Sequence, residues 1–249
     1  MIIIKNKEAL DAMLVAGRLL AELFEELKSF IVPGISTLDI DTYVTTYLQK
    51  HKLVSQTVGY AGYRHASCVS LNDEVVHGVP QAVKVIVSGD LVKVDVCAAL
   101  NNYCADMARC FIAGTPDSKK QQLIAVAQQS LDAGIAQAVP GKKLTDISYA
   151  IQQVVESAGC GVVRDFAGHG IGRKMHEAPE ILNYGKPGRG PLIREGMAFA
   201  IEPMITQGNY PVCVDKDGWT VRTVDGSLAA HVEDTVLVTQ HGPVIATRL

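Results

Sequence analysis

The chain has 249 residues, of which 48% are hydrophobic and 20% charged, and its formal net charge is −3. This composition is typical of a globular protein with a sizeable core and excludes extensive disorder. No run rich in lysine and arginine occurs, so nucleic acid is disfavoured as the main ligand. The chain begins with an apolar stretch of only three residues before Lys5, and no later segment reaches about 18 uninterrupted apolar residues. We therefore expect neither a signal peptide nor a membrane span.

Two helices are predicted at the start of the chain. Apolar residues recur at helical spacing over residues 6–29. The sequence Val32-Pro33-Gly34 ends this helix. Ser36 and Asp39 then form a candidate capping box for a second helix, which we expect to reach about His51.

Residues 91–111 predict a β-hairpin whose two apolar strands each contain an aspartate. Asn101-Asn102 tolerates the positive φ of a two-residue turn. Residues whose numbers sum to 203 then face each other, so Cys97 opposes Asp106 and Asp95 lies diagonal to Asp106. These three side chains share one face, with the diagonal Cα atoms about 7–8 Å apart. Repulsion between the two carboxylates calls for a cation or a shared proton.

The second half of the chain repeats the helical pattern of the first. Residues 118–138 predict a helix, Val139-Pro140-Gly141 ends it, and a further helix follows from about Thr145 to Ala158. The Val-Pro-Gly sequence and the Asp-Ile pair of the following helix lie 107 residues after their counterparts. A constant offset between two such units indicates an internal repeat.

The same offset relates two predicted strands. GDLVKVD (89–95) aligns with GMAFAIE (196–202), and each is an apolar strand that ends in an acidic residue. We therefore predict a single catalytic domain over 1–249, of class α+β, with halves of roughly 1–110 and 111–249 related by a pseudo-twofold axis. A solenoid is excluded because the unit is long and occurs only twice.

Five ligand-type side chains emerge from this pattern. Asp95 and Asp106 lie in the first half, Glu202 ends a strand, and Glu233 lies in a predicted alternating strand near the C-terminus. His169 stands between glycines, which allow the backbone to approach closely. Each residue alone has an ordinary structural explanation. Four carboxylates and one imidazole together suit two divalent ions about 3.5–4 Å apart.

The six cysteines include no CxxC pair, which argues against a zinc ribbon and a thioredoxin-type motif. A chain of this length does not need disulfides for stability. We expect free thiols and a cytoplasmic location.

Six segments resemble a known family: CVSLNDEVVHGVP (68–80), the Asp95 to Asp106 spacing, GHGIGRKMHEAPEI (168–181), AIEPM (200–204), DGWTVRTVDGSL (217–228) and HVEDT (231–235). They resemble the type I methionine aminopeptidases, which have the pita-bread fold with an antiparallel sheet around a dinuclear metal site. No zinc-finger extension precedes the first predicted helix, so we expect the short form.

The resemblance implies the metal ligands Asp95, Asp106, His169, Glu202 and Glu233, with Asp106 and Glu233 bridging two divalent ions. These ions would be Co, Mn, Fe or Zn, and the sequence does not decide among them. The implied reaction removes the initiator methionine from nascent proteins and peptides with a small second residue. A hydroxide that bridges the ions would attack the first peptide bond.

The resemblance also implies further roles. His77 would contact the scissile amide nitrogen, His176 would polarise the scissile carbonyl, and Glu202 would shuttle a proton. The methionine side-chain pocket would be lined by Tyr60, Tyr63, Cys68, Met175 and Trp219. Aromatic and sulfur-containing walls suit a thioether.

This chain departs from the usual residues of the family at several positions. Threonine is frequent at Cys97 and glutamine at His231, whereas Arg64-His65 replaces a proline and Met107-Ala108 replaces Thr-Ser. None of these departures removes an implied ligand. They leave open the width of the pocket and the metal preference.

Two other functions remain open. One is an Xaa-Pro aminopeptidase or prolidase on the same fold, because His-x-Glu-Asp at 231–234 is closer to the Arg-x-Glu-Asp of those enzymes. Such enzymes carry an additional amino-terminal domain, for which 249 residues leave no room. The other is a non-catalytic pita-bread binding protein, which would normally lack the ligands. We expect a monomer, and the sequence leaves open a transient ribosome contact.

Overall fold

The computed structural model describes residues 1–249. Its helices are α1 (Lys7–Phe30), α2 (Thr37–Lys50), α3 (Ser118–Ile135) and α4 (Leu144–Ser157), with a short 3₁₀ turn at Tyr60–Gly62. The strands are β1 (Val54–Ser55), β2 (Cys68–Leu71), β3 (Glu74–Val76), β4 (Leu91–Leu100), β5 (Tyr103–Ile112), β6 (Gly161–Val162), β7 (Gly168–Gly170), β8 (Glu177–Ile181), β9 (Ala198–Ile201), β10 (Met204–Thr206), β11 (Val212–Val214), β12 (Val221–Thr223), β13 (Ala229–His231), β14 (Glu233–Thr239) and β15 (Gly242–Ile245). None of the helices is both long and apolar enough to cross a lipid bilayer.

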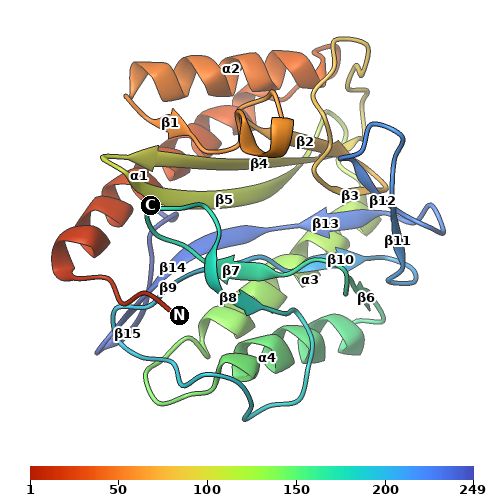
Figure 1. The fold of residues 1–249 in the computed structure, drawn as a ribbon. Helices are drawn as coiled ribbons and strands as arrows, with labels where there is room; N and C mark the ends of the chain where they lie inside the picture. The colour runs from red at the N-terminus through yellow and green to blue at the C-terminus, as the bar shows by residue number, and fades with distance from the viewer.

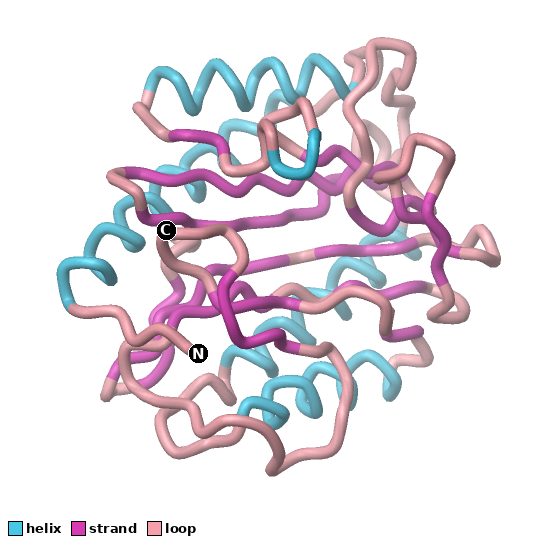
Figure 2. The backbone as a smooth tube through the Cα atoms, viewed as in Figure 1, coloured by secondary structure: helices cyan, strands magenta, loops and turns pink.

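The main sheet has nine strands in the order β1-β4-β5-β14-β9-β7-β8, with β2 added to β4 and β15 to β14. All of its paired strands are antiparallel. In the upper half of Figure 1, α1 and α2 lie on the same side of the molecule as β4 and β5. In the lower half, α3 and α4 lie on the same side as β9 and β14. Figure 2 shows the strands running between the two pairs of helices. Each half therefore buries its own helices against its own part of the sheet.

The helix boundaries follow from the caps in the sequence. The predicted capping box of α2 is present, because Asp39 N–H donates to Ser36 Oγ at 3.1 Å and Ser36 N–H donates to Asp39 Oδ2 at 2.7 Å. Helix α1 begins after Asn6, whose side chain accepts from Ala9 N–H at 3.0 Å. The predicted helix over 118–138 is confirmed, although α3 ends three residues earlier, at Ile135.

The predicted β-hairpin is confirmed in its turn and in its register. Asn101 and Asn102 have φ angles of 51° and 66°, the left-handed values that a two-residue turn requires. Cys97 pairs with Asp106, as the turn predicts. Val94 and Val96 face the core below α1 and α2, so the alternate residues of β4 point to the opposite face of the sheet.

The 107-residue repeat recurs in the backbone pairing. An isolated bridge joins Ser36 to Val85, and its counterpart 107 residues later joins Lys143 to Leu192. Hydrogen bonds recur in the same way: Gly34 N to Ile86 O at 2.9 Å with Gly141 N to Ile193 O at 3.1 Å, and Thr37 N to Lys84 O at 2.9 Å with Leu144 N to Pro191 O at 3.0 Å. The offset found in the sequence is therefore a structural repeat of the helix entry and of the segment packed beside it.

The prediction of one alternating strand near the C-terminus is wrong. The chain divides at Val232 into β13, which belongs to a three-stranded sheet with β10 and β6, and β14, which lies inside the main sheet. Every residue from 229 to 238 is buried. Strand β14 has neighbours on both edges and α3 on one face, so its residues do not alternate between core and solvent.

Asp234, the second residue of β14, is a fully buried carboxylate held by two arginines. Arg109 Nη2 lies 2.5 Å from Asp234 Oδ1, Arg248 Nε donates to Oδ2 at 2.8 Å, and the Thr247 hydroxyl donates to Oδ1 at 2.7 Å. We expect Asp234→Ala to lower the free energy of unfolding by about 3–5 kcal/mol, because the partly buried Arg109 loses its carboxylate partner and the buried Thr247 hydroxyl loses its acceptor. Urea denaturation measures the change.

Asp132 supplies the control for this prediction. It also pairs with Arg248, at 2.6 Å, but its side chain is 49% exposed. Asp132→Ala is expected to cost less than about 1 kcal/mol. Equal losses of unfolding free energy in the two variants would show that the buried Asp234 contributes no more to stability than the exposed Asp132.

Candidate metal centre

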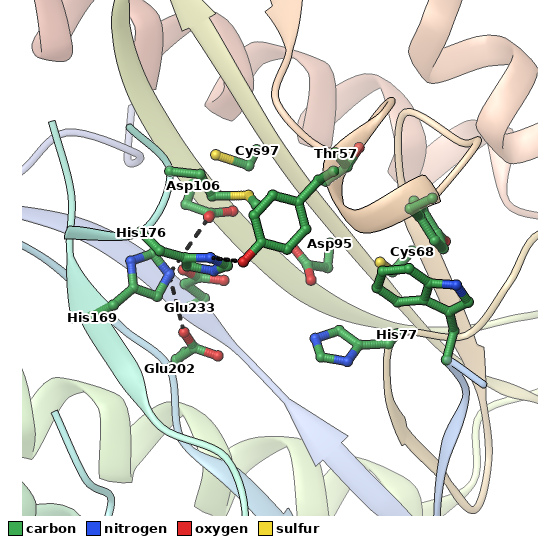
Figure 3. A pocket seen from close by; sticks show the side chains of 14 residues that line it. Thr57, Cys68, His77, Asp95, Cys97, Asp106, His169, His176, Glu202 and Glu233 are labelled. Atoms are coloured by element: carbon green, nitrogen blue, oxygen red, sulfur yellow. Dashed lines mark hydrogen bonds and ion pairs between the residues drawn. The ribbon is translucent and has the colours of Figure 1, made fainter. Parts of the chain in front are cut away.

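A single pocket on the face of the sheet opposite the helices collects the predicted site residues (Figure 3). Its lining comprises Thr57, Tyr60, Tyr63, Cys68, His77, Asp95, Cys97, Asp106, His169, Met175, His176, Glu202, Trp219 and Glu233. All twelve residues predicted from the sequence are in this set. Cys97, which the hairpin register places beside Asp106, also faces the pocket.

The ligand-type atoms of Asp106, His169 and Glu233 all lie within 4.8 Å of one another. His169 Nε2 is 3.9 Å from Asp106 Oδ2 and 3.4 Å from Glu202 Oε1, as the dashed lines in Figure 3 mark. Asp95 lies outside this compact group but lines the same pocket. Three of the five predicted ligands, Asp106, Glu202 and Glu233, thus lie around the fourth, the His169 imidazole. The fifth, Asp95, lines the same pocket.

Two hydrogen bonds help to position Asp106 and His169. Asp106 N–H donates to Thr235 Oγ1 at 2.8 Å, which ties β5 to β14 beside the site. His169 Nδ1 lies 3.0 Å from the Gly170 carbonyl oxygen. A carbonyl only accepts, so Nδ1 carries the proton and Nε2 presents a lone pair to the carboxylates.

The glycines around His169 are required by close backbone packing, as predicted. A Cβ atom on Gly168 would press against the Ala200 carbonyl oxygen, and one on Gly170 against the Ala178 carbonyl oxygen. Strand β7 can therefore approach β9 and β8 only without side chains at these two positions. This packing brings the His169 imidazole to the carboxylates.

Burial opposes ionisation of the four carboxyl groups. Desolvation, followed by repulsion from Asp106, raises the pKa of Asp95 to about 8. Desolvation, followed by repulsion from Glu202, raises the pKa of Asp106 to about 7. Desolvation also raises the pKa of Glu202 to about 8 and is the largest cause of the raised pKa of Glu233. Such a cluster needs protons or cations to remain buried.

Unpartnered atoms favour cations over protons. Asp106 Oδ1 and Glu233 Oε1 are both buried and have no hydrogen-bond partner. Hard carboxylate oxygens next to one imidazole nitrogen are the donors that Mn²⁺, Co²⁺, Fe²⁺ and Zn²⁺ accept. The residues therefore fit divalent metal ions, which would satisfy these oxygens and balance their charge.

Two further histidines flank the carboxylates. His77 adopts a left-handed backbone with φ of 57°, a strained conformation for a residue other than glycine. Burial lowers its pKa to about 4, so it is neutral at pH 7. His176 Nδ1 lies 3.0 Å from the Tyr60 hydroxyl, and its ring packs edge-on against His169. Both imidazoles can therefore act as uncharged hydrogen-bond donors or acceptors beside the four carboxylates.

An aromatic and sulfur-containing recess adjoins the carboxylates. Tyr63 and Trp219 pack edge to face with their ring centroids 4.9 Å apart, and the Tyr63 hydroxyl donates to the Ser67 carbonyl at 3.0 Å. Cys68 and Met175 are buried beside the same pocket. The walls of the recess are apolar, and the end next to the carboxylates is polar. Such a recess suits a residue whose apolar side chain packs against the walls while its polar groups lie next to the carboxylates.

The sequence reasoning did not assign His231 to the site. Its Nε2 lies 3.5 Å from Glu202 Oε2 and 3.9 Å from Glu233 Oε2, and its ring is 2% exposed. The available signal was its spacing: in the continuous strand that the sequence predicts, His231 would share a face with Glu233, two residues later.

Comparison with known proteins places this geometry in a family. The model for metallopeptidase family M24 matches residues 11–240. The chain belongs to metallopeptidase family M24. Among M24 relatives, the methionine aminopeptidase of Clostridium acetobutylicum is 45% identical over 247 residues, covering 99% of each chain.

Solved M24 structures agree with this assignment. The methionine aminopeptidase of Thermotoga maritima matches with a TM-score of 0.97 and 43% identity over 100% of both chains. The prolidase of Pyrococcus furiosus matches with a TM-score of 0.78 at 21% identity, over 99% of this chain and 66% of that one, which supports the fold alone. The predicted pita-bread fold and the resemblance to the methionine aminopeptidases are therefore confirmed. Use of divalent metal follows from the M24 family and the carboxylate cluster.

Proposed function

We propose that this chain removes the N-terminal methionine from nascent proteins and peptides whose second residue is small. The observation that carries the proposal is the meeting of the carboxylate and imidazole cluster with the aromatic and sulfur-lined recess in one pocket. The cluster suits hydrolysis of a peptide bond, and the recess suits a thioether side chain. The names of the M24 relatives at 42–45% identity support the same activity.

Two divalent ions are part of the proposal. Asp95, Asp106, His169, Glu202 and Glu233 would hold them, with Asp106 and Glu233 shared between both. When bound, such ions lower the pKa of water toward neutrality and polarise the carbonyl of the scissile bond. Four carboxylates, two of them buried and two partly buried, balance two doubly charged ions, which supports the number two.

The remaining chemistry belongs to the side chains. The Glu202 carboxylate accepts a proton from the attacking water and returns it to the leaving amine. A hydrogen bond donated by the Tyr60 hydroxyl to His176 Nδ1, 3.0 Å away, would leave Nε2–H to donate to the carbonyl oxygen of the scissile bond. His77, on the other side of the carboxylates in Figure 3, contacts the nitrogen of that bond.

Trp219 tests the assignment of the recess. We expect Trp219→Ala to raise KM for a Met-Ala peptide about tenfold, because the recess loses an aromatic wall worth about 1.4 kcal/mol. The change in kcat should be smaller, since Trp219 does not touch the reacting atoms. Tyr149→Ala removes an exposed aromatic ring of α4 away from the pocket and serves as the control. An equal KM in the two variants would mean that the methionine side chain of the substrate does not bind in this recess.

The test of the function is a matrix of metals and substrates. The protein is stripped of metal, reloaded with Co²⁺, Mn²⁺, Fe²⁺ or Zn²⁺, and given Met-Ala-x, Leu-Ala-x and Ala-Pro-x peptides. We expect cleavage of Met-Ala-x alone. Cleavage of Ala-Pro-x instead would favour an Xaa-Pro enzyme, and no cleavage together with no bound metal would favour a binding protein.

The setting of this activity is also proposed. Nascent chains carry the initiator methionine, so the substrate is met in the cytoplasm, with a ribosome contact that would be transient. All six cysteines are free, which agrees with a reducing compartment. We also propose a monomer, and one chain is sufficient to supply the twelve predicted pocket residues.

A further inference from the structure

The strand register reveals a counterpart of Asp106 in the second half of the chain. In the first half, Asp106 pairs with Cys97, two residues beyond Asp95. The 107-residue offset carries Cys97 to Met204, two residues beyond Glu202. Met204 pairs with His231. His231 therefore occupies, in the second half, the register position that the ligand-type residue Asp106 occupies in the first.

The nitrogen of His231 that faces the cluster has no partner. Nε2 is buried and makes no hydrogen bond, while the side chain is 2% exposed. A buried imidazole nitrogen without a partner is costly unless something in the functional state binds it.

The distances around His231 match those around His169. His169 Nε2 lies 3.4 Å from one oxygen of Glu202 and 3.9 Å from Asp106. His231 Nε2 lies 3.5 Å from the other oxygen of Glu202 and 3.9 Å from Glu233. The ligand-type atoms of Glu202, His231 and Glu233 lie within 4.8 Å of one another, as do those of the Asp106, His169 and Glu233 group. Glu202 is thus flanked by two imidazoles.

We propose that His231 is a sixth ligand of the metal centre and binds through Nε2 an ion shared with Glu202 and Glu233. This inference rests on the proposed dinuclear site. Each half of the chain would then place a ligand at the equivalent register position, a carboxylate in one and an imidazole in the other. A second nitrogen donor favours the borderline ions Zn²⁺ and Co²⁺ relative to Mn²⁺, which prefers oxygen.

The experiment measures metal binding rather than peptide cleavage. Metal-free protein and its His231→Gln and His231→Leu variants are titrated with Zn²⁺ and with Mn²⁺ against a competing chelator. We expect Zn²⁺ to bind at least about 100-fold more weakly in both variants, beyond what loss of an outer hydrogen bond usually causes. The loss for Mn²⁺ should be smaller. Circular dichroism and thermal melting of the metal-free proteins establish that the variants fold.

His51 provides a matched control. Its Nε2 is also buried without a partner, but it stacks on Tyr47 in the α2 region and has no place in either ligand-type group. His51→Gln should bind Zn²⁺ as the original protein does. X-ray absorption of the zinc-loaded proteins counts imidazoles directly, and the number per two ions should fall from two to one in His231→Gln.

Two outcomes would overturn the proposal. If His231→Gln binds Zn²⁺ normally while His231→Leu does not, the side chain only donates a hydrogen bond to Glu202, because glutamine can still donate. If neither variant changes zinc binding, His231 has no role at the metal. Failure of the proposed function is distinct, since it would show as absence of metal binding or of Met-Ala-x cleavage in the original protein.

Discussion

Glu233→Gln is expected to lower kcat/KM for a Met-Ala peptide by at least about 10⁴-fold, equivalent to about 5.5 kcal/mol of transition-state stabilisation. Glu233 is 2% exposed, one of its oxygens has no protein partner, and it belongs to both ligand-type groups. Replacing one oxygen by an amide removes the negative charge that two ions would share. Steady-state kinetics with saturating Co²⁺ or Mn²⁺ measures the loss.

The control for this variant is Glu180→Gln. Glu180 lies on β8 opposite His169 in the ladder, but its side chain is exposed and lines no part of the pocket. It should keep its activity within about twofold. If Glu233→Gln were folded and retained more than a tenth of the activity, Glu233 would not be a shared ligand.

Removal of metal should abolish cleavage and also destabilise the protein. At ion concentrations of 100 times the dissociation constant, each bound ion adds about 2.7 kcal/mol to the free energy of unfolding. For a chain of this size, that corresponds to a rise in Tm of about 5–10 °C per ion. Differential scanning calorimetry after treatment with EDTA, and again after addition of Co²⁺ or Zn²⁺, measures the shift.

The Glu233→Gln variant makes this prediction specific. Its Tm should respond much less to EDTA and to added metal, because a shared ligand is missing. Equal metal-dependent shifts in the two proteins would mean that the stabilising ions bind elsewhere. A Tm that is independent of metal in the original protein would contradict a buried carboxylate cluster that needs cations.

Local signals in the sequence predict the local parts of the fold. Asn101-Asn102 sets the turn, the turn sets the register of β4 and β5, and the register brings Asp95 and Asp106 to one face. Ser36 and Asp39 likewise place the start of α2 through their own hydrogen bonds. In each case the decisive contacts lie close together in the sequence.

Contacts between distant segments could not be predicted in the same way. The break between β13 and β14 at Val232 depends on which sheet each part joins, and a pattern of buried residues does not encode that choice. The left-handed backbone of His77 also depends on its surroundings. Only the family resemblance predicts that His77 and His176 lie near the carboxylates, since neither residue belongs to a strand.

The internal repeat could be predicted from the sequence only in part. A constant offset in the sequence predicted that Asp95 and Glu202 are equivalent, but it gave no counterpart for Asp106. That counterpart emerges only when the strand pairs are known, because the connection from β10 to β13 is longer than the turn between β4 and β5. The offset therefore changes at the second strand and leads to His231.

The two halves meet in the main sheet along a very short seam. Only two residue pairs join β5 to β14, Ala108 with Glu233 and Met107 with Asp234. Of the two β14 residues in these pairs, Glu233 is a proposed ligand of both ions, and Asp234 is the carboxylate that pairs with Arg109. An ion held by ligands from both halves would therefore contribute its binding free energy to keeping the two parts of the sheet together. Metal ions at the proposed site would then stabilise the fold as well as serve the reaction.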